Sequence, residues 1–148
     1  MYKASIMEPL SPGEATMIAA MARQVKDGDW AACGTLSPMP AAALWLAQLT
    51  HAPQAQIMVA GSRDWPFDDE WREFFDLAQQ GRLNVFFLSG AQIDGLGNLN
   101  LMAVGDYLKP KVRLPGGAGS AILAYMVARV ALFKTAHEPR GLVPKVDC

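Results

Sequence analysis

Apolar positions near the start of the chain follow a helical spacing. Met17, Met21 and Val25 fall on one face of a helix. The segment Ser11-Pro12-Gly13-Glu14 before them has the residue types of a capping box, in which Ser and Glu satisfy the free amides of the first turn. The pattern predicts a helix that ends at Lys26-Asp27-Gly28-Asp29, where a glycine and two acids interrupt it.

The rest of the chain alternates between strand-like and helix-like segments. The pattern predicts strands at 30–34, 56–61, 84–88, 100–104 and 130–134, and helices at 41–49, 68–80 and 120–128. The helix after position 67 has an acidic first turn at Asp68, Asp69 and Glu70, and Gly81 is expected to cap its end.

The alternation predicts one α/β domain over residues 1–148, with an open, mostly parallel sheet and helices on both faces. The continuous apolar run 85–88 is typical of a strand that is covered on both sides.

Composition limits the partners and the compartment. Thirteen Lys and Arg balance fourteen Asp and Glu, so we expect no nucleic acid and no anionic membrane as a partner. The two cysteines, Cys33 and Cys148, form neither a disulfide framework nor a metal-ligand spacing, which favours a reducing cytoplasm and no metal. The N-terminus lacks the features of a signal peptide, and no apolar run reaches the roughly 18 residues of a membrane span. We therefore expect a soluble cytoplasmic protein.

Candidate binding residues lie in loops, because ligands of open α/β sheets bind at the carboxyl ends of the strands. The candidates are small or polar residues in the loops that follow predicted strands: Gly34, Gly61, Gln92, Asn98, Asn100, Gly116, Gly117 and Gly119.

The glycine loop 114–120 has two interpretations of about equal weight. Its backbone amides can receive a phosphate, a carboxylate or an oxyanion, or its glycines can serve only a sharp turn into the next helix. No Gly-Lys-Ser/Thr follows, and Ile122 stands where a dinucleotide fingerprint needs its third glycine or alanine. For Gln92, substrate binding and a structural role are equally favoured, whereas Asn98 after Gly97 is more typical of a turn.

Two long segments resemble a known family. FDLAQQGRLNVFFLSGAQIDGLGNLN and GDYLKPKVRLPGGAGSA, which follow a KDGD turn and a THAP segment, are similar to the β subunits of family I coenzyme A transferases, especially the glutaconate CoA-transferase type. The resemblance covers the chain from about residue 11 to 148.

The resemblance implies a cytoplasmic heteromer with an α-type subunit and an active site between the two subunits. It implies CoA transfer between carboxylic acids, with acyl-CoA and carboxylic acid as substrates, CoA as a substrate only, and no metal or redox cofactor. In such transferases a glutamate attacks the acyl-CoA carbonyl while backbone amides stabilise the oxyanion.

The sequence departs from that pattern at its expected nucleophile. The glutamate belongs in a Glu-x-Gly pattern after the second strand, but Val59 stands there, before Ala60 and Gly61. An alkyl group cannot form the anhydride, so the catalytic residue of this chain is unknown, and we expect no transferase chemistry by one of its own carboxylates. The chain also ends at 145–148, where members of the family usually continue, so we expect either that the rest lies elsewhere or that this is a minimal or truncated subunit.

Three alternatives stay open. Relatives that open steroid-derived rings as CoA thioesters take their glutamate from the α subunit, so this chain is also compatible with thioester hydrolysis or ring opening. Val59 and the early end of the chain also motivate a non-catalytic scaffold subunit that binds or stabilises its partner. An unrelated α/β protein that binds a sugar phosphate or nucleotide at the loop 114–120 is the third alternative.

Overall fold

A parallel sheet forms the centre of the protein in the computed structural model, which describes residues 9–68 and 71–148. The strands lie in the order β2 (Gln56–Val59), β1 (Trp30–Cys33), β3 (Val85–Leu88) and β8 (Arg129–Leu132). All three pairings are parallel, and Ala32 of β1 aligns with Met58 on one side and Phe86 on the other. The carboxyl ends of the four strands therefore lie along one edge of the sheet, which we call the carboxyl edge.

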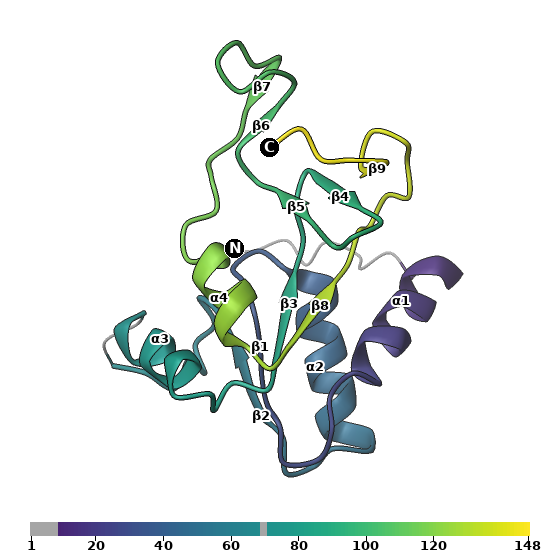
Figure 1. Cartoon of the computed structure of the whole chain (residues 1–148). Helices are drawn as coiled ribbons and strands as arrows, with labels where there is room; N and C mark the ends of the chain where they lie inside the picture. Colours follow the sequence, from purple (N-terminus) through teal and green to yellow (C-terminus); the bar gives the residue numbers. More distant parts are fainter. Residues whose placement is uncertain (1–8, 69–70) are drawn as a thin grey trace, which may run out of the picture.

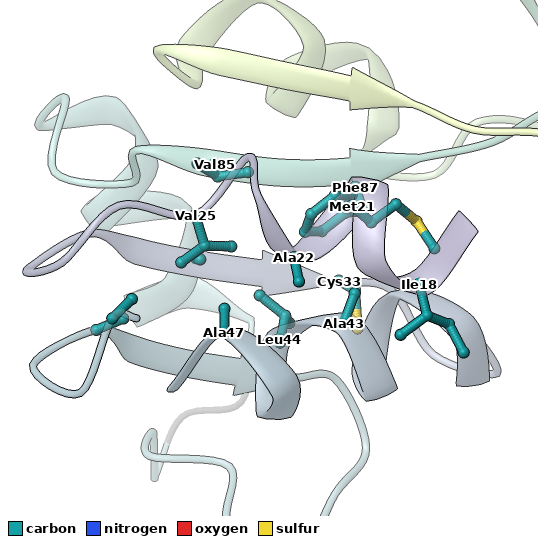
Figure 2. Packing of buried hydrophobic residues seen from close by; sticks show 13 residues of the cluster. Ile18, Met21, Ala22, Val25, Cys33, Ala43, Leu44, Ala47, Val85 and Phe87 are labelled. Atoms are coloured by element: carbon teal, nitrogen blue, oxygen red, sulfur yellow. The ribbon is translucent and has the colours of Figure 1, made fainter. Parts of the chain in front are cut away.

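Helices cover both faces of this sheet (Figure 1). α1 (Pro12–Ala22) and α2 (Pro38–Thr50) pack on one face, and α3 (Arg72–Gln79) and α4 (Ser120–Met126) pack on the other. Successive side chains of a strand point to opposite faces, and Phe87 of β3 accordingly joins the α1/α2 core whereas Phe86 joins the α3/α4 core. Figure 2 shows the α1/α2 core, in which Leu44 of α2 lies beside Cys33, and Val25 lies between Ala47 of α2 and Val85 of β3. The predicted open α/β fold is confirmed.

The helix ends follow the sequence closely at α1 and less closely at α3. The Ser11 hydroxyl accepts from the Glu14 amide at 3.3 Å, and the Glu14 carboxylate accepts from the Ser11 amide at 2.8 Å, which is the predicted capping box. α3 begins only at Arg72, so Asp68 precedes the helix, and positions 69 and 70 lie outside the described residues. Within residues 9–68 and 71–148, no helix has the length and apolarity to cross a membrane.

The predicted strand at 100–104 is wrong. Its residues are divided between β5 (Leu99–Asn100), which pairs with β4 (Gln92–Asp94), and β6 (Ala103–Val104), which pairs with β7 (Val112–Arg113). β9 (Leu142–Val143) completes the sheet of β4 and β5. The break has a local cause, because the Asn100 side chain accepts from the amides of Met102 and Ala103 and turns the backbone between the two short strands.

Candidate functional site

The loops after β1 and β2 lie side by side at the carboxyl edge. The Ala60 amide donates to the Cys33 carbonyl at 3.1 Å, and Gly61, which has a φ of +77°, lies beside the side chain of Thr35. Gly34 and Gly61 are therefore close to each other. Val59 is half-buried and its side chain packs against the α1/α2 core.

Cys33 ends the central strand β1 but is poorly suited to nucleophilic chemistry. Its side chain is 1 % exposed, and this burial raises the pKa of the thiol to about 12. The thiolate is the reactive form of a cysteine, so Cys33 belongs to the packing of the core.

Gln92 and Asn100 form one buried hydrogen-bonded group after β3. The Asn100 side-chain nitrogen donates to the Gln92 side-chain oxygen at 2.7 Å and to the Ala103 carbonyl at 2.6 Å. The Gln92 side-chain nitrogen donates to Asp147 at 2.9 Å, and the Asp147 amide donates back to the Gln92 oxygen at 3.1 Å. Both side chains have partners within the chain, which favours a structural role for them. Their predicted contact with substrate stays a prediction.

Two aspartates organise the same region through amide donors. Asp94 accepts from the Asn98 side chain and backbone and from the backbone amides of Leu96 and Val146, and these bonds, the Asn98 side chain first, hold its pKa below the ordinary value. The pKa of Asp147 is also lowered, first by the Gly105 amide and then by the Gln92 side chain. Asn98 thus has the turn role that its sequence context favoured.

The glycine loop 114–120 is attached to this region by its backbone. The Gly116 amide donates to the Leu101 carbonyl at 3.1 Å, and Gly116 has a φ of +91°, which favours glycine. Leu101 follows Asn100, so the predicted loops at Gln92 and Gly116 meet. At Gly119 a side chain would collide with the ring of Phe75, so close packing of α3 requires glycine there.

A cavity of about 690 Å³ lies where these segments meet the sheet. We call it the β5–α4 cavity; its lining includes Leu88, Asn98, Leu101, Met102, Gly117, Ser120 and Tyr125. Of the predicted binding residues, the cavity brings together Asn98 and Gly117. Gln92, Asn100 and Gly116 support its walls from behind, and Gly34, Gly61 and Gly119 lie outside its lining.

A larger groove, of about 820 Å³, lies on the other face of β8, between that strand and α1. It contains none of the predicted binding residues, and we regard the β5–α4 cavity as the candidate site for that reason. Lys134 lies in the larger groove and donates to the carbonyls of Gly90 at 2.6 Å and Ala91 at 3.0 Å, next to β3. Sequence reasoning missed Lys134 and Asp147, because each acts on a segment more than 40 positions away.

The described residues that line the cavity offer backbone amides and uncharged polar side chains. Among the described residues that line it, none is an aspartate or a glutamate. In the described part of the chain, no three His, Cys, Asp or Glu residues gather as metal ligands would. Such a cavity can hold an apolar or uncharged segment of a ligand and present amides to it.

The sheet order, the two helical layers and the cavity at the carboxyl edge define an open α/β domain. The profile of the coenzyme A transferase family matches residues 54–147, which include both segments that bound the β5–α4 cavity. The chain belongs to the coenzyme A transferase family.

Characterised relatives are single subunits of such enzymes. The chain is 34 % identical over 142 residues to one subunit of the 3-oxoadipate CoA-transferase of Pseudomonas knackmussii, covering 82 % of this chain and 54 % of that protein. It is 29 % identical to one subunit of the glutaconate CoA-transferase of Acidaminococcus fermentans, covering 86 % of this chain and 55 % of that protein. The chain thus spans about half the length of the curated relatives it matches.

A solved structure agrees with the fold. The crystal structure of the decarboxylase AibA/AibB superimposes with a TM-score of 0.81 at 29 % identity, covering 95 % of this chain and 66 % of that chain. The resemblance stated from the sequence is confirmed at the level of the family.

Proposed function

We propose that the chain is a β-type subunit of a two-subunit enzyme of the coenzyme A transferase family, which binds an acyl-CoA thioester and works with an α-type subunit in the cytoplasm. The observation that carries the proposal is that the family match covers both segments bounding the β5–α4 cavity. The two curated relatives, each of which is one subunit of its enzyme, support the need for a second subunit.

The role proposed for this chain is to hold the thioester. The amide of Gly117 and the side chain of Asn98, which both line the β5–α4 cavity, are the groups we assign to the acyl end, because an oxyanion that forms at the carbonyl is stabilised by fixed donors. CoA serves as a substrate. Transfer between carboxylic acids needs no metal or redox cofactor, because a carboxylate is the nucleophile and a thiolate is the leaving group.

The nucleophilic carboxylate is proposed to come from elsewhere in the assembly. Val59 stands at the position that the resemblance gives to the glutamate, and no described lining residue of the β5–α4 cavity is an aspartate or a glutamate. The main proposal is CoA transfer between carboxylic acids, completed by the α-type partner. Val59 also favours a second candidate, hydrolysis or ring opening of a CoA thioester that relies on the partner's glutamate.

Co-expression with an α-type chain of the family tests the proposal. The purified assembly is incubated with a panel of acyl-CoA thioesters, with and without acceptor carboxylic acids, and products are separated by mass. New acyl-CoA supports transfer, whereas free CoA formed without an acceptor supports hydrolysis. An assembly that forms but neither binds CoA nor consumes any thioester would contradict both candidates and leave a scaffold role.

A matched pair of variants at position 59 separates the two reactions. Val59→Glu supplies a carboxylate, and Val59→Gln has nearly the same shape without the charge. If this chain can host the transferase nucleophile, incubation of Val59→Glu with acyl-CoA yields a chain whose mass has increased by CoA bound as a thioester, and Val59→Gln does not. Equal masses for the two variants would argue that the carboxylate acts from the partner.

A further inference from the structure

A basic hairpin rises from the rim of the β5–α4 cavity. β6 and β7 pair antiparallel, with Val104 opposite Val112 and the Lys111 amide donating to the Val104 carbonyl at 2.9 Å. Figure 1 shows this β6–β7 hairpin, residues 103–113, projecting from the carboxyl edge and away from the sheet. The side chains at 106–109 and 111–113 are exposed.

The hairpin concentrates positive charge in a chain that is nearly neutral. Lys109, Lys111 and Arg113 are exposed, and Asp106 is the one acidic residue within 103–113. Asp147, which accepts from the Gly105 amide at 2.7 Å, lies close enough to Lys111 to interact with its charge, so Lys109 and Arg113 carry the larger part of the uncompensated charge. The Asp106 carboxylate accepts from the amides of Leu108 at 2.8 Å and Lys109 at 3.1 Å, so it serves the turn of the hairpin. The whole chain has a net charge of −1, and the excess of cations here is therefore a local feature.

A planar pair accompanies these charges. The Arg113 guanidinium lies 4.8 Å from the centroid of the Tyr107 ring and donates to the Tyr107 carbonyl at 2.9 Å. The Tyr107 side chain is 51 % exposed. A guanidinium that is already held over an aromatic ring loses little freedom on binding, and such a pair suits a ligand that has both phosphates and a flat ring.

The base of the hairpin is part of the cavity wall. Leu101 and Met102 line the β5–α4 cavity and lead directly into β6, and the Leu114 amide after β7 donates to the Met102 carbonyl at 3.0 Å. One extended ligand can therefore occupy the cavity with one end and reach the hairpin with the other. The cavity is lined mainly by apolar groups, and the hairpin is basic.

We propose that the β6–β7 hairpin binds the nucleotide end of CoA, with Lys109, Lys111 and Arg113 pairing with its phosphates and the Tyr107–Arg113 pair contacting its adenine. The uncharged pantetheine arm then enters the β5–α4 cavity. The inference rests on the proposed function, since CoA as the ligand comes from the family. It adds the residues that recognise the charged part of the substrate.

Titration of the full chain, alone and assembled with its α-type partner, tests the proposal. CoA, 3′-dephospho-CoA and pantetheine are titrated into the unaltered protein and into Lys109→Gln/Lys111→Gln. The expected loss of CoA affinity is about 10-fold. Each exposed ion pair with a phosphate adds only a small binding free energy, and the variant removes two such pairs. The loss for 3′-dephospho-CoA is smaller, and pantetheine affinity does not change. Added salt weakens CoA binding to the unaltered protein more than to the variant.

A charge-matched control removes two cations that lie before β1, at the amino ends of the strands. Arg23→Gln/Lys26→Gln changes the net charge by the same amount, and both residues are exposed before β1. This variant keeps its CoA affinity if the hairpin binds the phosphates. Arg113→Lys keeps the charge but removes the planar group, and we expect it to weaken CoA binding while circular dichroism shows an unaltered fold.

The outcomes distinguish failure of the hairpin proposal from failure of the proposed function. Equal CoA affinity in the unaltered protein and in Lys109→Gln/Lys111→Gln overturns the hairpin proposal alone. Loss of partner association, with CoA affinity kept, overturns it in favour of an interface with the partner. If the unaltered assembly binds no CoA at all, both the hairpin proposal and the proposed function fail.

Discussion

Asn100→Ala is expected to destabilise the protein strongly for a single polar substitution. Asn100 is 0 % exposed and makes four side-chain hydrogen bonds. The one that matters most is the bond from the Ala103 amide at 3.2 Å, since Ala103 is itself 0 % exposed and its amide cannot reach water. The Met102 amide, in contrast, belongs to a residue that is 41 % exposed and can be hydrated after the substitution.

The magnitude follows from these contacts. A buried donor that loses its partner costs about 1–3 kcal/mol, and each hydrogen bond that water can replace costs about 0.5–1.5 kcal/mol. We expect the free energy of unfolding to fall by about 3 kcal/mol, which corresponds to a decrease in Tm of roughly 6–12 °C for a chain of this size. Asn100→Asp removes the side-chain donor but keeps nearly the same volume. Comparing its loss of stability with that of Asn100→Ala therefore separates the cost of the lost donor from the cost of the cavity that alanine leaves.

Urea unfolding followed by circular dichroism measures the effect. The midpoint should fall while the slope m stays constant, as expected for a change in stability alone. Asn98→Ala is the control, because Asn98 is exposed and its side chain donates a hydrogen bond to Asp94 that water can replace, so its cost should be about 1 kcal/mol or less. A loss below about 1 kcal/mol for Asn100→Ala, or one equal to the control, would refute the reasoning.

Three further predictions concern packing, pH and thiol chemistry. Gly119→Ala should lower the free energy of unfolding by about 1–3 kcal/mol in urea unfolding, because the new methyl group meets the Phe75 ring, and Gly119→Ala/Phe75→Leu should recover part of it. The lowered pKa values of Asp94 and Asp147 contribute stability that is fully present above the ordinary value of 3.8 and is lost below it. Thermal melts from about pH 6 to pH 3 should show this loss, and asparagine at both positions should reduce it. Cys33 should resist alkylation in the folded protein at about pH 8, as checked by intact mass, since its pKa is about 12; modification at the rate of an unfolded control would contradict this.

The layers of the fold could be predicted because they depend on local pattern. The capping box at Ser11 and Glu14 lies within one turn, and the apolar run 85–88 indicates a strand buried on both faces wherever it lies in the sheet. The prediction of a strand at 100–104 was wrong because the local sequence there is compatible with two backbone conformations. An asparagine can stand in a strand or can turn the backbone with its own side chain, and Asn100 does the second.

The candidate site was predictable only in part, because its contacts join distant segments. Gln92 was as compatible with substrate binding as with a structural role, and its bond to Asp147, 55 positions away, favours the second. Gly119 was expected to bring the backbone close to a ligand, but the structure places the Phe75 ring against it. The residues next to Gln92 and Gly119 in the sequence contain no pattern that would predict either contact.

The hydrogen bonds of Gln92 and Asn100 connect the cavity to the hairpin. Gln92 and Asn100 use their hydrogen bonds to fix residues 101–103, which form both the wall of the β5–α4 cavity and the base of the β6–β7 hairpin. If the proposed function holds, their substitution should therefore change the positions of the cavity and the hairpin together and lower the affinity for CoA. Because no described lining residue is an aspartate or a glutamate, a loss of turnover that exceeds the loss of CoA affinity in such variants would support the proposal that a carboxylate of a partner subunit is aligned through this same segment.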